Sequence, residues 1–227
     1  MNKNTDYKNL VSYWNKVFSL SKKEYVNYQD LAPSPKLFDV LQLFKGKDNV
    51  LDYGCGDGWA SIIMAKSGTK HIEACDVTEN SITLVNERKK LYQVEDIINA
   101  FQIDENWIKN QKEGEFDGFF SSNVIDVIPL DMAEDIIKNA ANVVKKDAPV
   151  VFSLNYYIDP ELMAQRGAIV KGKQVYLEGV LRLTSLKDEE WLKIFKKYYE
   201  LVSLDYYAWP GEKDETRRLF VLKPLMK

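Results

Sequence analysis

Two aspartates and a set of alternating glycines lie close together in residues 50–61, VLDYGCGDGWAS. The apolar start of this stretch predicts a buried strand, and the residues after the glycines have helical periodicity. Glycines in such a turn lack the Cβ atoms that would collide with a nucleoside, so the backbone can approach a ligand closely. Asp52 at the strand end and Asp57 in the turn favour a cationic ligand and disfavour a pyrophosphate. The glycines are Gly54, Gly56 and Gly58.

The segment Leu51–Gly58 resembles motif I of the class I S-adenosylmethionine-dependent methyltransferases, in which an apolar strand and an acidic residue precede G-x-G-x-G. Glycine spacing alone is a weak signal, but the acidic strand end and a second acid downstream make it specific. The resemblance covers about residues 37–222 and implies S-adenosylmethionine as the cofactor. The alternative is a glycine-rich turn between strand and helix that holds no ligand.

Residues 72–77 predict a second strand that ends in an acid, Asp76, which lies 18 residues after Gly58. In α/β folds a carboxylate at this strand end accepts hydrogen bonds from the ribose hydroxyls of a nucleoside. The other interpretation is an aspartate that caps a helix or lies on the surface.

The resemblance also implies a loop that holds the adenine, at residues 102–107. We favour Asp104 there, with Glu105, Asn106 or the backbone of Ile103 as alternatives. The predicted cofactor-binding residues are Asp52, Gly54, Cys55, Gly56, Gly58, Asp76, Val77, Asp104, Ser121, Tyr13 and Trp14.

The acceptor side has no motif of comparable specificity. Aromatic residues are expected near the ligand-binding edge of the sheet, where they suit an apolar or aromatic small molecule or a cation. Arg166 and Arg182 could instead bind a carboxylate. We assign no catalytic residue, because the single histidine, His71, falls at the far end of the sheet and a tyrosine base would need a strongly lowered pKa. The predicted substrate-binding residues are Asn123, Tyr156, Tyr157, Tyr176 and Arg182.

Periodicity along the chain predicts an α/β fold. The expected structure is a Rossmann-like, seven-stranded methyltransferase sheet, mostly parallel with the last strand antiparallel, with helices on both faces and an inserted β-hairpin lid. We expect an N-terminal helical flap at residues 1–36 and a methyltransferase domain at 37–227, with the lid at about 156–184. Lys171-Gly172-Lys173 predicts the hairpin turn, and Ser185 predicts the N-cap of the helix that follows.

Composition narrows the possible partners. The 227 residues carry a net charge of −3, which disfavours a nucleic-acid substrate. Two cysteines without metal-ligand spacing, no long apolar run and no signal-peptide pattern predict a reduced cytoplasmic protein with no metal and no membrane contact. A monomer or a homodimer is expected.

Four functions remain to be distinguished. The favoured one is methyl transfer to a small molecule by in-line displacement. The alternatives are a protein that binds S-adenosylmethionine without transferring its methyl group, a peptide or protein methyltransferase, and a nicotinamide-dependent oxidoreductase. The last would need a longer glycine spacing and would lack an acid at position 52.

Overall fold

The computed structural model describes residues 3–21 and 24–225, with side chains from residue 7 onward. Within this part of the chain, seven strands form a sheet in the spatial order β3-β2-β1-β4-β5-β10-β9. The strands are β1 Val50–Tyr53, β2 Ile72–Asp76, β3 Ile98–Gln102, β4 Gly118–Ser122, β5 Val150–Leu154, β9 Tyr199–Tyr207 and β10 Arg217–Pro224.

Strands β1 to β5 run parallel to one another, and β10 runs antiparallel to both β5 and β9. This confirms the predicted fold class, including the reversed last strand. The spatial order changes direction between β1 and β4, because β1 pairs with β2 on one side and with β4 on the other. Open α/β sheets bind ligands at such a point, beyond the carboxyl ends of the strands.

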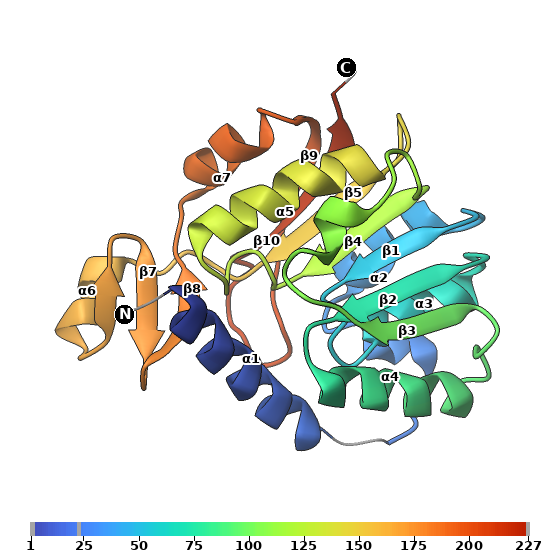
Figure 1. The fold of residues 1–227 in the computed structure, drawn as a ribbon, viewed down its shortest axis with the longest axis horizontal. Coiled ribbons are helices and arrows are strands. Elements are labelled where there is room, and N and C mark those ends of the chain that lie inside the picture. Colours follow the sequence, from blue (N-terminus) through green and yellow to red (C-terminus); the bar gives the residue numbers. More distant parts are fainter. Residues whose placement is uncertain (1–2, 22–23, 226–227) are drawn as a thin grey trace.

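Helices cover both faces of this sheet (Figure 1). Helices α5 and α7 pack on one face, and α2, α3 and α4 pack on the other. The helices are α1 Lys3–Ser19, α2 Pro35–Leu41, α3 Trp59–Ser67, α4 Glu79–Leu91, α5 Leu130–Val143, α6 Pro160–Gln165 and α7 Asp188–Phe195, with short 3₁₀ turns η1 Tyr28–Leu31, η2 Gln42–Phe44 and η3 Trp107–Asn110.

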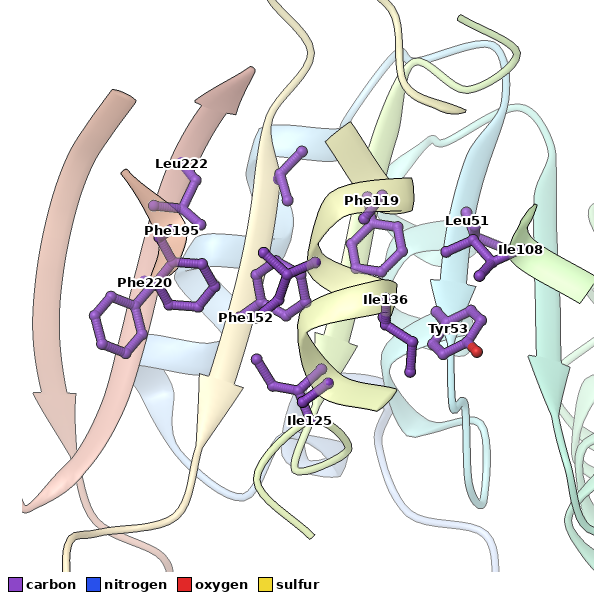
Figure 2. Close-up of a cluster of buried hydrophobic side chains, with 14 of the residues drawn as sticks. Leu51, Tyr53, Ile108, Phe119, Ile125, Ile136, Phe152, Phe195, Phe220 and Leu222 are labelled. Atoms are coloured by element: carbon purple, nitrogen blue, oxygen red, sulfur yellow. The ribbon is translucent and has the colours of Figure 1, made fainter. Parts of the chain in front are cut away.

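Alternation along each strand decides which residues meet which helices. On the α5 and α7 face, Tyr53 stacks on Phe119 at 6.0 Å between ring centroids, and Phe152 contacts Phe195 at 5.3 Å. Figure 2 shows this aromatic and aliphatic layer, with Ile136 of α5 beside Tyr53. The next residue on β4, Phe120, faces α3 instead.

The inserted segment, residues 156–184, forms α6 and a separate three-stranded antiparallel sheet. Its strands are β6 Ile169–Lys171, β7 Gln174–Leu177 and β8 Val180–Thr184. The turn predicted at Lys171–Lys173 connects β6 to β7, so the hairpin is present, but a third strand follows it. The second turn contains Glu178 and Gly179, which both have positive φ (51° and 76°), the geometry of a tight hairpin turn.

Helix α7 begins later than predicted. Its N-cap is Lys187, whose backbone N–H donates to Glu190 Oε2 (2.8 Å), so the prediction that Ser185 caps this helix is wrong. The hydroxyl of Ser185 instead donates to Ile158 O (2.5 Å) and accepts from Ile158 N (3.0 Å), which ties the base of the inserted segment together.

Helix α1 crosses the carboxyl-end edge of the sheet, between α4 and β8 (Figure 1). Leu10 of this helix is buried and belongs to the hydrophobic cluster on the α5 face. Within the described residues, none of the helices combines the length and the apolar character that crossing a bilayer requires.

Candidate functional site

A cavity of about 640 Å³ opens at the carboxyl ends of β1, β2 and β4. It lies at the change of strand direction between β1 and β4, where this class of sheet binds ligands. The glycine turn forms its floor, and the inner side of α1 contributes Tyr7, Trp14 and Phe18 to its wall. The volume is within the range of pockets that enclose small molecules.

The glycine turn between β1 and α3 requires glycine for reasons of backbone and space. Gly54, Gly56 and Gly58 all have positive φ, between 53° and 78°. A Cβ on Gly54 would clash with the Val124 side chain, and one on Gly58 would lie 2.9 Å from Val85 Cγ2. The turn therefore presents main-chain atoms without side chains, and Gly54 and Gly56 line the cavity.

Asp52 lies behind this turn on the α3 face of β1. Only 2% of the residue is exposed, and its Oδ2 accepts a hydrogen bond of 2.5 Å from Ser61 Oγ. Burial raises the pKa of Asp52 to about 7. A nearby positive charge would favour its ionised form, so the site is suited to a cationic ligand.

Asp76 lies at the end of β2, at the cavity wall. Its Oδ2 accepts from Gly56 N (3.1 Å), and its Oδ1 accepts from Thr78 N (2.9 Å) and Thr78 Oγ1 (2.7 Å). These bonds fix the carboxylate beside the glycine turn, and burial raises its pKa. A carboxylate has about four acceptor positions, so a ligand hydroxyl fits this group. Val77 follows it on the wall.

The loop after β3 brings Ile103 and Glu105 to the cavity wall. Asp104 is exposed and outside this wall, and its Oδ1 accepts from Asn106 N (2.9 Å). Of the alternatives that the sequence left open for the adenine loop, the structure therefore brings Ile103 and Glu105 to the cavity.

At the end of β4, the predicted cofactor residue Ser121 does not reach the cavity, and the next two residues do. Ser121 is 1% exposed and absent from the cavity wall, whereas Ser122 and Asn123 line the cavity. Asn123 takes a positive φ of 55°, so the strand ends there and its backbone turns toward α5.

Among the predicted residues of the glycine turn, Cys55 lines the cavity and Gly58 does not.

The remaining predicted residues gather around the inserted segment instead. The guanidinium of Arg182 lies 4.0 Å from the centroid of the Tyr13 ring, so β8 contacts α1 there. Tyr176 lies under Lys171 and Tyr157 near Lys187, at 4.5 and 5.9 Å. None of these side chains, nor that of Tyr156, is part of the cavity wall within the described residues.

Several cavity residues were absent from the predicted set. They come from segments that are distant in sequence, and only Trp59, directly after the glycine turn, had a local signal. They include Asp30, Leu31, Trp59 and Phe120.

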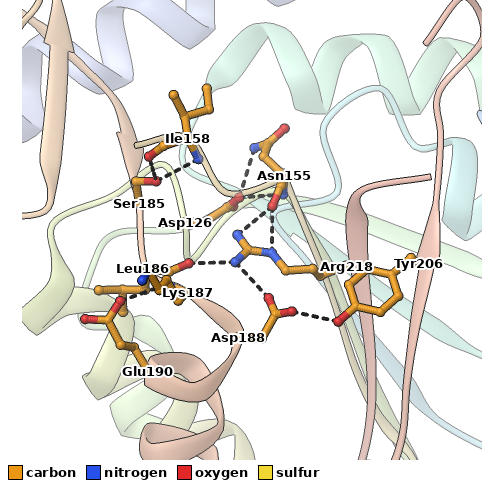
Figure 3. Close-up of polar contacts among 10 residues, drawn as sticks. All are labelled: Asp126, Asn155, Ile158, Ser185, Leu186, Lys187, Asp188, Glu190, Tyr206 and Arg218. Atoms are coloured by element: carbon orange, nitrogen blue, oxygen red, sulfur yellow. Dashed lines mark hydrogen bonds and ion pairs between the residues drawn. The ribbon is translucent and has the colours of Figure 1, made fainter. Parts of the chain in front are cut away.

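A buried polar network connects the cavity to the inserted segment (Figure 3). Asp126, in the loop after β4, is fully buried, and its Oδ2 accepts from Asn155 N (2.7 Å) and Asn155 Nδ2 (2.9 Å). Its backbone oxygen accepts from Thr184 N (2.6 Å) at the end of β8. Arg218 donates to the backbone oxygens of Asn155 and Leu186, each at 2.6 Å. The loop that lines the cavity is thereby fixed to the base of the inserted segment.

Within the part of the chain that the structure describes, no group of three or more histidine, cysteine, aspartate or glutamate side chains could hold a metal ion.

The family model described as "Methyltransferase domain" matches residues 50–147, the segment that carries the glycine turn, Asp76 and the end of β4. A ribosomal protein L11 methyltransferase of Ruminiclostridium cellulolyticum is 28% identical over 159 residues, which are 67% of this chain and 44% of that protein. The chain spans less than half the length of the curated relatives that it matches.

Solved structures with the same fold cover nearly the whole chain. The PH0226 protein from Pyrococcus horikoshii OT3 has a TM-score of 0.69 and 16% identity, over 92% of this chain and 99% of that one. An S-adenosylmethionine-dependent methyltransferase from Mesorhizobium loti has a TM-score of 0.63 and 13% identity, over 86% of this chain and 99% of that one. These likenesses show the fold, and the family match over the glycine turn and Asp76 implies S-adenosylmethionine as the cofactor.

Proposed function

The chain belongs to the class I, Rossmann-like family of S-adenosylmethionine-dependent methyltransferases, and from this premise we propose that it transfers a methyl group to a small-molecule acceptor. The observation that carries the proposal is the convergence of Asp52, the bare glycine turn and Asp76 on one cavity. S-adenosylmethionine supplies a methyl group on a positively charged sulfur, which is the reactive centre of an in-line displacement.

The chain's own residues would bind the cofactor and orient its methyl group toward the acceptor. Asp76, fixed by Gly56 N–H and Thr78, is placed to accept ribose hydroxyls, and Ile103 and Val77 offer apolar surface to the base. The backbone of Gly54 and Gly56 allows close approach, and Asp52 provides negative charge on the α3 face of the same cavity. Methyl transfer needs mainly alignment of the two reactants, so we assign no catalytic base.

Helix α1 would act as the flap predicted for residues 1–36. Trp14 and Phe18 line the cavity from this helix, and the Phe18 ring would lie 3.2 Å from a Cβ on Gly56. A ligand that passes over the glycine turn therefore has to displace or contact Phe18. Closure by α1 supports a small acceptor, because it limits the space above the cavity.

A protein acceptor is the second candidate, since curated relatives are named as ribosomal protein L11 methyltransferases. The inserted segment exposes Leu162, Ile169 and Leu177, which a polypeptide could cover.

The test is to incubate the protein with S-adenosylmethionine and to measure S-adenosylhomocysteine formed with a small-molecule panel and, separately, with a total ribosomal protein fraction. We expect product with small molecules. Product with the protein fraction alone would support the second candidate. Cofactor binding without any product in either arm would indicate a binding protein that does not transfer methyl groups.

A further inference from the structure

The cavity extends to both faces of the sheet. Tyr53 and Ile103, on the α5 face, belong to one hydrophobic cluster, and Ala60 and Phe120, on the α3 face, belong to the other. All four line the same cavity. A nucleoside bound by Asp76 and the loop after β3 would occupy the part of the cavity above β2 and β3, which leaves a second region above β1 and β4 on the α3 face.

We call this second region the aromatic compartment. Phe120 is the partner of Asp52 in the register between β4 and β1, and both side chains face α3, so Asp52 forms part of this compartment. Trp59 packs edge-on against Phe120, with 5.8 Å between ring centroids. The compartment is lined by Asp30, Leu31, Asp52, Trp59, Phe120 and Trp209.

The charges around the cavity are strongly unbalanced. Its described lining contains six carboxylates and two cationic side chains. Both cations are already paired, Arg88 with Asp57 (2.6 Å) and Lys109 with Asp135 (2.8 Å). The other carboxylates have no cationic partner in the described part of the chain. They are Asp30, Asp52, Asp76 and Glu105.

The arginine that contacts Trp209 of the aromatic compartment is also paired. The guanidinium of Arg217 lies 3.9 Å from the centroid of the Trp209 ring, but it donates to both carboxylate oxygens of Glu212 (2.7 and 2.8 Å) and to Asn155 Oδ1 (2.6 Å). The compartment therefore offers carboxylates and aromatic faces and no unpaired cation within the described residues.

We propose that the methyl acceptor is an amine attached to an apolar or aromatic group, which binds in the aromatic compartment as a cation beside Asp30. This inference rests on the proposed function and names the acceptor class of the same site. Aromatic faces and a carboxylate both attract an ammonium group, whereas a carboxylate or phosphate acceptor would meet like charge without a cation to pair with.

The chemistry balances with these groups. The bound ammonium first releases one proton to water, which frees the nitrogen lone pair. That pair then forms the N–CH₃ bond while the S–CH₃ bond breaks and its electrons remain on sulfur. The positive charge thus passes from sulfur to nitrogen, and the acidic cavity stabilises it throughout. An anionic nucleophile would lose this stabilisation on entering the cavity.

The experiment is calorimetric titration of the protein saturated with S-adenosylhomocysteine. The probes are tryptamine, tryptophol and indole-3-propionate, which share the indole and differ in charge. We expect tryptamine to bind at least tenfold more tightly than either of the others. Equal affinities, tighter binding of the carboxylate, or no binding of tryptamine would overturn the proposal.

A matched pair of variants tests whether Asp30 is the residue that selects tryptamine. Asp30→Asn is expected to weaken tryptamine binding about tenfold and to leave S-adenosylhomocysteine affinity unchanged. Asp39→Asn, an exposed aspartate on α2 outside the cavity wall, makes the same charge change and is expected to alter neither. Equal effects of the two variants would remove Asp30 from the proposal.

The two proposals fail in different ways. If S-adenosylhomocysteine does not bind, the proposed function is wrong, and the order of the three indole probes on the free protein still decides whether the compartment selects amines. If it binds and the amine is not preferred, the proposed function stands and the acceptor class is wrong.

Discussion

Two carboxylates at the cavity, Asp52 and Asp76, are buried, and burial disfavours their ionised forms. Both are less than 10% exposed, and burial raises the pKa of each. Hydrogen bonds from Ser61, Gly56 and Thr78 reduce this effect without removing it. A buried ionised carboxylate lowers stability unless a positive charge balances it. The ligand is the natural source of that charge, which ties the stability of the free protein to pH.

We predict that Asp52→Asn increases the free energy of unfolding at pH 8 relative to the unsubstituted protein, and much less at pH 5. The folded-state pKa of Asp52 is about 7 against 3.8 for an unperturbed aspartate, so the folded state binds the proton more tightly. The contribution of Asp52 to stability is complete below about pH 3.8 and is lost as the pH rises through 7. The loss is about 4 kcal/mol at most. Denaturant unfolding at both pH values measures it, and an equal difference between the proteins at pH 5 and pH 8 would contradict this account.

Asp76→Ala is predicted to weaken ligand binding in a protein that still folds. Asp76→Ala removes the proposed acceptor for a ribose hydroxyl and is expected to weaken S-adenosylhomocysteine binding about a hundredfold, roughly 2.8 kcal/mol. The exposed Asp96→Ala is the control with the same charge change. Calorimetry gives the affinities, and circular dichroism shows whether both variants fold. Unchanged affinity in Asp76→Ala would exclude Asp76 from the site.

At the scale of elements, α1 is held by contacts to two different elements, α4 and β8. Asn15 accepts from Asn80 N (2.9 Å), and its backbone oxygen accepts from Asn80 Nδ2 (3.0 Å), which joins α1 to α4. Tyr13 lies under Arg182 and joins α1 to β8. Sequence reasoning placed Tyr13 with the cofactor and Arg182 with the substrate, and the structure instead brings the two together outside the cavity wall. If α1 is the proposed flap, this contact would hold it against the inserted segment.

Arg182→Ala is predicted to weaken S-adenosylhomocysteine binding about two- to fivefold, because a cation–π contact contributes roughly 0.5–1 kcal/mol. The change should be in the dissociation rate, since the latch acts after the ligand has entered. Arg166→Ala, an exposed arginine in the same inserted segment, is the matched control. Stopped-flow measurement of release distinguishes them, and identical rates would mean that the inserted segment does not hold α1.

For the molecule as a whole, the sequence predicts the features that depend on short motifs and on the periodicity of apolar residues. The glycine turn, Asp52 and the second acid lie on consecutive elements, so their spacing predicted both the fold and the place of the cavity. The sequence did not predict that Phe120 and Leu31 reach the cavity, because these two residues meet only through tertiary packing. It also missed the third strand of the inserted sheet, since its turn places Glu178, a residue other than glycine, at positive φ.

The central claim is that the cavity at the carboxyl ends of β1 and β2 holds S-adenosylmethionine. The most direct measurement is calorimetric titration of the purified protein with S-adenosylmethionine, S-adenosylhomocysteine and NAD. We predict one binding site for each of the two sulfur nucleosides and no binding of NAD. Binding of NAD, or of none of the three, would contradict the assignment of the cavity.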